Sequence, residues 1–130
     1  MAFHNWSMKS ERIQKKSYIY TCRKIVKAMV RHEWIEPPPE GKQMSWDHVF
    51  SCQIAYLSHL PLNVANCPMN LELIGYKENN RKGTRCYQGV DLLIEKWEKW
   101  PDKVEFTMWL NEYENKWGIS FSELIQPIIV

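Results

Sequence analysis

Three consecutive prolines at positions 37–39 constrain the fold of this chain more than any other feature. Proline lacks the amide hydrogen that a helix interior needs, and it disfavours helical backbone in the residue before it. A helix that precedes this segment must therefore end before Pro37. The run predicts a loop from Glu36 to Met44, with one helical segment before it and the rest of the chain after it.

The segment before the prolines has the spacing of an amphipathic helix. Apolar residues recur there every three or four positions, namely Tyr18, Cys22, Ile25, Val26, Met29 and Val30. The pattern predicts a helix over residues 17–34 with one face in the core and the other face basic. Residues 1–16 contain four Lys or Arg and are interpreted as a basic N-terminal extension, ahead of a single domain over residues 17–130.

Further helices are predicted after the prolines. Ser45 is a residue type that caps helix N termini, and Pro61 marks a helix end. The predicted helices cover residues 45–60, 71–74, 84–97 and 106–117, with a short last helix after Ser120. No segment of any length alternates as a strand does, so the predicted fold class is all-α, an antiparallel bundle of five or six helices.

Composition favours a globular, cytoplasmic protein. The chain is 45% hydrophobic and contains seven Trp, which is enough material for a core. No run approaches the roughly 18 apolar residues of a membrane-spanning helix, and no apolar stretch near the N terminus has the pattern of a secretory signal. The four cysteines have no paired spacing and are expected to be reduced thiols.

Charge is distributed unevenly along the chain. Residues 1–44 contain nine Lys or Arg against four Asp or Glu, whereas residues 89–130 contain four against eight. The candidate basic surface is Arg23, Lys24, Lys27 and Arg31, and the candidate acidic surface is Glu95, Glu98, Asp102, Glu112 and Glu114. Two such surfaces are either merely solvated or attract complementary partners or further copies of the chain.

Four apolar pieces follow one another in a recognisable order. They are Trp46–Phe50 after the proline-rich loop, Leu71–Ile74, Tyr87–Trp97, and Phe106–Tyr113 with Ile119 and Leu124 beyond it. Over about residues 20–127 this order resembles the death domain, a six-helix module of signalling proteins, and in particular the death domains of netrin receptors.

The resemblance implies a binding module without catalytic activity or cofactor. Death domains associate with other death domains through complementary charged and polar surfaces. The resemblance therefore implies an adaptor that joins a signalling complex, with other death-domain proteins or the chain itself as partners and the two charged surfaces above as its contacts.

Nucleic-acid binding is the main alternative. The basic residues between positions 9 and 31 could form one stripe, with Tyr18 and Tyr20 between them as groups that stack on bases. A sequence pI near 8.3 is only mildly basic, however, and the acidic last third of the chain repels phosphate. Charge therefore favours a protein partner.

The sequence also offers candidate residues for metal binding and for catalysis. His48, Cys52 and His59 lie four and seven residues apart and could share one helix face, with Cys67 as a fourth metal ligand. No closely spaced ligand pair is present, so we interpret this face as part-buried and expect no bound metal. Neither a nucleophile beside a base nor a glycine-rich phosphate loop is recognisable, so no enzyme activity is expected.

The tryptophans divide into two groups. Those on apolar stripes are expected in the core, namely Trp46, Trp97, Trp109 and Trp117. Those off a clean stripe are the candidates for exposed contact residues, namely Trp6, Trp34 and Trp100.

Overall fold

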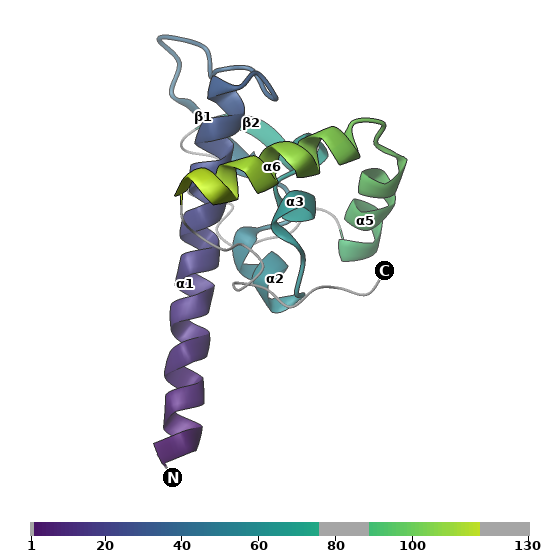
Figure 1. The fold of residues 1–130 in the computed structure, drawn as a ribbon. Helices are drawn as coiled ribbons and strands as arrows, with labels where there is room; N and C mark the ends of the chain where they lie inside the picture. The colour runs from purple at the N-terminus through teal and green to yellow at the C-terminus, as the bar shows by residue number, and fades with distance from the viewer. Residues whose placement is uncertain (1, 76–88, 118–130) are drawn as a thin grey trace.

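The computed structural model describes residues 2–75 and 89–117, without the side chains of residues 2–11, 114, 115 and 117. The elements of this part of the chain are α1 (Ala2–Arg31), β1 (Met44–His48), α2 (Cys52–Leu57), α3 (Leu62–Ala65), the 3-10 helix η1 (Pro68–Asn70), β2 (Leu71–Gly75), α5 (Val90–Lys99) and α6 (Lys103–Trp117). Figure 1 shows the C-terminal half of α1 beside the other elements, while its N-terminal half extends away from them. None of the described helices is long and apolar enough to cross a membrane.

The all-α prediction is wrong, because two segments predicted as helices form an antiparallel sheet. Strands β1 and β2 pair with Met44 opposite Gly75 and His48 opposite Leu71. Leu71 and Ile74 are both buried, and this three-residue spacing is what made the segment look helical. Runs of five residues are too short for periodicity to separate a strand from a helix, and the pairing partner lies more than twenty residues away.

The predicted helix over residues 45–60 is replaced by a strand, a turn and the short helix α2. The residue that caps this helix is Ser51 rather than Ser45, since the Ser51 Oγ accepts a hydrogen bond of 3.3 Å from the Ile54 N–H. Ser45 lies within β1 instead. The structure therefore uses the same capping chemistry six residues later than predicted.

Helices α1 and α2 both end on a non-glycine residue with left-handed backbone. Glu33 has φ 64°, and the Trp34 N–H returns to the Met29 carbonyl at 2.9 Å. His59 has φ 56°, and the Leu60 N–H returns to the Ala55 carbonyl, also at 2.9 Å. This arrangement usually employs glycine, so the sequence carries no signal for it. As a result α1 ends at Arg31, and the chain reverses at Glu33, before the prolines.

The core is centred on the apolar face that the sequence predicted for α1. Tyr18, Ile25 and Met29 are fully buried there, and the Tyr18 hydroxyl donates a 3.0 Å hydrogen bond to the Leu60 carbonyl. This bond ties the middle of α1 to the end of the α2 segment. The core face of the predicted first helix is thus confirmed, although the helix begins at Ala2 rather than Ser17.

Aromatic residues join α5 and α6 to the end of α1. Phe106 is fully buried, and its ring lies 5.1 Å from that of Trp34 and 5.4 Å from that of Trp100. Trp97 and Trp109 pack against the core from the same two helices. Trp34 and Trp100, expected as candidates for exposure, are therefore half-buried members of this cluster, whereas the side chains of Trp6 and Trp117 lie outside the described residues.

The C-terminal predictions are tested only in part. Helices α5 and α6 lie where the fourth and fifth helices were predicted, and α6 begins at Lys103. The proposed cap at Thr84 and the short helix after Ser120 lie outside the described residues. Phe106, Leu110 and Tyr113 turn the predicted apolar side of α6 toward the core.

The buried amide of Asn70 holds the irregular segment together. Its Oδ1 accepts from the Phe50 N–H at 2.8 Å, and its Nδ2 donates to the carbonyls of Phe50 at 3.1 Å and Ala65 at 2.7 Å. Asn70 is 0% exposed, so these backbone groups have little access to water. A single side chain thus supplies hydrogen-bond partners to backbone groups just before α2 and at the end of α3.

We expect Asn70→Ala to lower the free energy of unfolding by at least about 3 kcal/mol, because it leaves three buried backbone groups without partners. Urea denaturation followed by tryptophan fluorescence measures this loss. Asn63→Ala is the matched control, because the half-buried Asn63 amide donates only one long-range bond, to Thr107 Oγ1 at 3.0 Å. Its expected cost is about 1 kcal/mol. Equal losses in the two variants would contradict the bracing role of Asn70.

Candidate functional site

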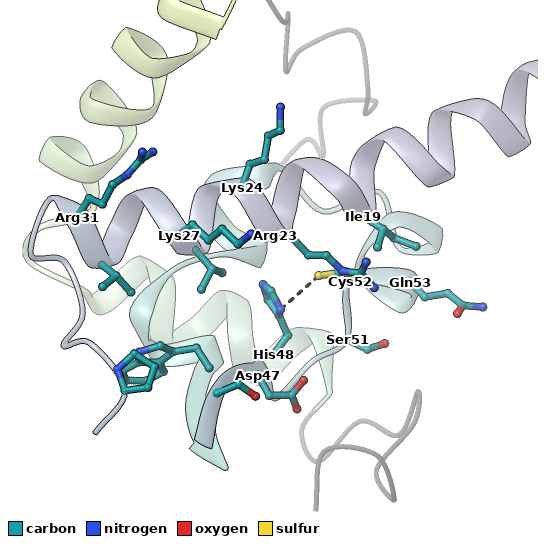
Figure 2. Close-up of a pocket in the computed structure, with 15 residues that line it drawn as sticks. Ile19, Arg23, Lys24, Lys27, Arg31, Asp47, His48, Ser51, Cys52 and Gln53 are labelled. Carbon is teal, nitrogen blue, oxygen red and sulfur yellow. Dashed lines mark hydrogen bonds between the residues drawn. The ribbon is translucent and has the colours of Figure 1, made fainter. Parts of the chain in front are cut away.

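A groove of about 1100 Å³ lies between the C-terminal half of α1 and the segment formed by β1 and the start of α2. Basic and aliphatic side chains of α1 form one wall, and residues 45–48 and 51–53 form the other. Figure 2 shows the two walls facing each other, with His48 and Cys52 between them. The groove is therefore built from a helix and a strand that are separated by the proline loop, and Pro38 of that loop also lines it.

All four residues of the predicted basic surface line this groove. Arg23, Lys27 and Arg31 repeat every four residues and so follow one side of α1, with Lys24 beside them. Figure 2 shows Arg23 extending toward Cys52, whereas Lys24 and Arg31 point away from His48. Asp47 is the one carboxylate among the lining residues, so the groove favours anionic ligands.

The structure does not bring the predicted acidic residues together. Glu95 and Glu98 are exposed on α5, and Asp102 lies in the turn before α6. Glu112 lies about 15 Å farther along α6, at 1.5 Å per residue, and the Glu114 side chain is outside the described residues. Asp91, which sequence reasoning left out, is exposed one turn before Glu95. The compact acidic group is therefore Asp91, Glu95 and Glu98 on one stripe of α5, which we call the α5 stripe.

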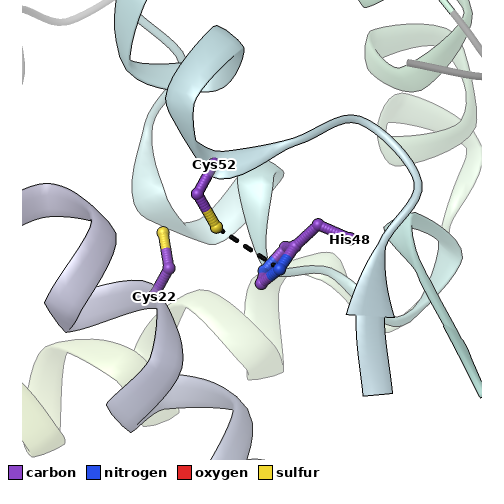
Figure 3. A group of neighbouring side chains, drawn as sticks. All are labelled: Cys22, His48 and Cys52. Atoms are coloured by element: carbon purple, nitrogen blue, oxygen red, sulfur yellow. Dashed lines mark hydrogen bonds between the residues drawn. The ribbon is translucent and has the colours of Figure 1, made fainter. Parts of the chain in front are cut away.

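Three potential metal ligands meet at the floor of the groove. Cys22 comes from α1, His48 from the end of β1 and Cys52 from the first turn of α2, and their ligand atoms all lie within 4.8 Å of one another. The Cys52 Sγ and the His48 Nδ1 are 3.3 Å apart. Figure 3 shows the Cys52 sulfur directed at the His48 ring, with the Cys22 sulfur beside it.

Asn66 orients the His48 ring. Its Nδ2 donates to the Leu62 carbonyl at 2.9 Å, which identifies Oδ1 as the amide atom 2.7 Å from His48 Nε2. Because an amide oxygen only accepts, His48 Nε2 must carry a hydrogen. In the neutral ring the lone pair is then on Nδ1, which faces Cys52. The Asn66 Nδ2 also lies 3.5 Å from Cys22 Sγ, so one buried amide contacts two of the three ligands.

The surroundings shift the pKa values of the two cysteines in opposite directions. A hydrogen bond from Cys22, followed by the hydrogen bond and charge of His48, lowers the pKa of Cys52 to about 5 against the opposing effect of burial. Burial raises the pKa of Cys22 well above its usual value. Burial disfavours the charged form of His48, but its hydrogen bond with Cys52 and the nearby sulfur outweigh this and raise its pKa.

The candidate metal ligands taken from the sequence include His48 and Cys52, which belong to this cluster. The other two candidates, His59 and Cys67, do not belong to it. His59 is exposed and forms the left-handed end of α2, and Cys67 is buried outside the cluster. Cys22 was assigned only to the core face of α1, where it does lie with 0% exposed. No periodicity reveals that this face meets β1 and α2, so neither Cys22 nor Asn66 could have been assigned to the site from the sequence.

Comparisons with known proteins give no match. No protein-family model matches the chain, and no curated protein or solved structure is significantly similar to it. The resemblance to the death domain therefore stays a prediction. The mixed fold of the described residues differs from the all-α bundle that the resemblance implies.

We expect Cys52 to be alkylated first by iodoacetamide in the reduced, metal-free protein. Because its lowered pKa is about 5, the rate rises with pH up to that region and levels off above it, as the thiolate fraction does. Cys67 should resist at neutral pH, since burial raises its pKa to about 11. Peptide mapping by mass spectrometry measures both rates.

The matched variant for this experiment is His48→Gln. It removes the imidazole that helps to hold the Cys52 thiolate, so the midpoint of the alkylation profile should move to higher pH. An unchanged midpoint would show that His48 does not influence Cys52.

Proposed function

We propose that this chain is a non-enzymatic protein-interaction module that assembles with further copies of itself. The groove beside the basic surface of one copy receives the α5 stripe of another. The observation that carries this proposal is that Arg23, Lys24, Lys27 and Arg31 all line one groove, where Asp47 is the single carboxylate among the described lining residues.

The two surfaces are complementary in spacing as well as in charge. Arg23 and Lys27 are one helical turn apart, as are Asp91 and Glu95, so both sets repeat at about 6 Å. Glu95 already forms a 2.8 Å ion pair with Lys99, but both side chains are well exposed and such a pair exchanges easily. Contact between unlike surfaces leaves one of each free on every pair, so the assembly continues into a ring or a filament.

A protein partner fits the groove better than nucleic acid does. Of the two tyrosines expected to stack on bases, Tyr18 is fully buried and Tyr20 does not line the groove. Aliphatic side chains of α1 line it instead, including Ile19, Val26 and Val30. An acidic helix that carries apolar residues, such as Leu92 of α5 with 45% exposure, matches this mixture.

A charge-reversal experiment tests the proposal. Arg23→Glu with Lys27→Glu should weaken self-association at least about tenfold, because two attractive contacts become repulsive. Light scattering after size-exclusion chromatography measures the molar mass over a concentration series at low salt. The wild-type assembly should also weaken toward physiological salt, where the screening length falls to about 8 Å.

The control and the reciprocal variant sharpen the test. Arg12→Glu with Lys42→Glu changes the net charge equally at exposed residues outside the groove and should leave assembly intact. Glu95→Lys with Glu98→Lys should be monomeric alone, yet should form a complex with the Arg23→Glu, Lys27→Glu variant through the restored contacts. A monomeric wild type, or assembly that survives reversal of the basic residues, overturns the proposal. Binding of a single-stranded oligonucleotide by that monomer would favour nucleic acid instead.

A further inference from the structure

The cluster at the floor of the groove has a chemistry that protein association does not use. Two thiols and one imidazole are the ligand types that Zn²⁺ takes in proteins, commonly in tetrahedral geometry. We propose that Cys22, His48 and Cys52 bind one Zn²⁺ ion, with the fourth coordination position facing the groove. This site goes beyond the proposed self-association and is tested separately from it.

The distances suit a tetrahedral ion. With bonds of about 2.3 Å to sulfur and 2.0 Å to nitrogen, a tetrahedral Zn²⁺ places a sulfur and a nitrogen ligand about 3.5 Å apart. The Cys52 Sγ and His48 Nδ1 are 3.3 Å apart. The Cys22 Sγ lies within 4.8 Å of both, and two sulfurs on one ion are separated by about 3.8 Å. The ligand atoms are thus already close to the separations that one tetrahedral ion requires.

The charges also suit a buried site. Two thiolates and a neutral imidazole around Zn²⁺ give no net charge, so binding brings no uncompensated charge into a site where Cys22 is 0% exposed. Any proton that Cys22, Cys52 or the His48 Nδ1 still carries leaves to solvent as the ion binds, which keeps the proton balance closed.

Asn66 supplies the orientation that a metal-binding histidine requires. Such a histidine usually donates its second ring N–H to a carbonyl or carboxylate, which fixes the tautomer and the ring plane. Here Nε2 donates to the Asn66 Oδ1 at 2.7 Å, which leaves Nδ1 as the ligand atom on the side of both sulfurs. Asn66 is itself buried and held by the Leu62 carbonyl.

The fourth position is set by the groove. His48 and Cys52 line it, whereas Cys22 lies behind them and closes the inner side of the cluster. The described residues place no further cysteine, histidine or carboxylate within reach. Zinc sites with three protein ligands usually hold a water molecule in the fourth position, and we expect the same here.

Metal titration of the full chain tests the site. The protein is stripped with a chelator under a phosphine reductant and titrated with Zn²⁺ in competition with a chromophoric chelator. We expect one ion per chain. Substitution with Co²⁺ should give a thiolate-to-cobalt charge-transfer band and the intense visible bands of a tetrahedral complex. A wild-type protein that lacks the thiolate band, or that binds no ion tighter than the chelator, overturns the proposal without any variant.

Matched cysteine variants locate the ion. Cys22→Ala and Cys52→Ala should each lower the affinity at least about 100-fold, because each removes a direct ligand. Cys67→Ala removes the other thiol of the described residues, which lies outside the cluster, and should leave the affinity unchanged. Cys86→Ala removes the remaining cysteine of the sequence and is also expected to leave the affinity unchanged. Circular dichroism checks that each variant is folded. Loss of binding in either control, or its retention in both ligand variants, assigns the ion to another site and overturns the proposal.

Asn66→Ala separates a positioning role from direct coordination. The three ligands remain, so the cobalt spectrum should keep its thiolate band, while the affinity falls about 10–100-fold because the ring is no longer oriented. Unchanged affinity would contradict the role of Asn66 in preparing the site.

Discussion

The packing of α1 against the segment between Phe50 and Leu71 is the constraint on which the rest of the structure depends. The apolar face of α1 supplies Tyr18, Ile25 and Met29 to the core, and the Tyr18 hydroxyl locks it to the Leu60 carbonyl. The same packing places the basic side of α1 along the groove. A helix gains most of its stability from packing one side against other elements. The orientation of that buried side then fixes where the opposite, basic side lies.

The segment that α1 packs against has little regular structure of its own. Its helices are short, and two buried asparagines, Asn66 and Asn70, take over the hydrogen bonding that longer elements would provide. Buried polar groups of this kind stabilise a fold only when fully paired, and they then favour one arrangement over its competitors. Asn66 links this structural role to the site, because its amide contacts Leu62, His48 and Cys22.

The groove and the cluster below it offer two kinds of chemistry in one place. Basic side chains on α1 favour an acidic surface, while two thiols and an oriented imidazole favour a soft metal ion. Arg23 belongs to both, since it lines the groove and its charge acts on Cys52. The proposed partner surface and the proposed metal site therefore share Arg23 as a neighbour.

The sequence by itself determined which residues of α1 are apolar and which are basic, and where α5 and α6 lie, because helical periodicity is a local property. The four-residue spacing of His48 and Cys52 predicted one shared helix face, whereas the structure brings them together across the turn between β1 and α2. Only the tertiary structure decided that residues 44–48 and 71–75 pair as strands, since their hydrogen bonds join distant parts of the chain. The helix ends at Glu33 and His59 depend on left-handed backbone without glycine, which leaves no local signal. Cys22 and Asn66 reach the site through packing of separate elements, and periodicity within one element carries no information about its neighbours.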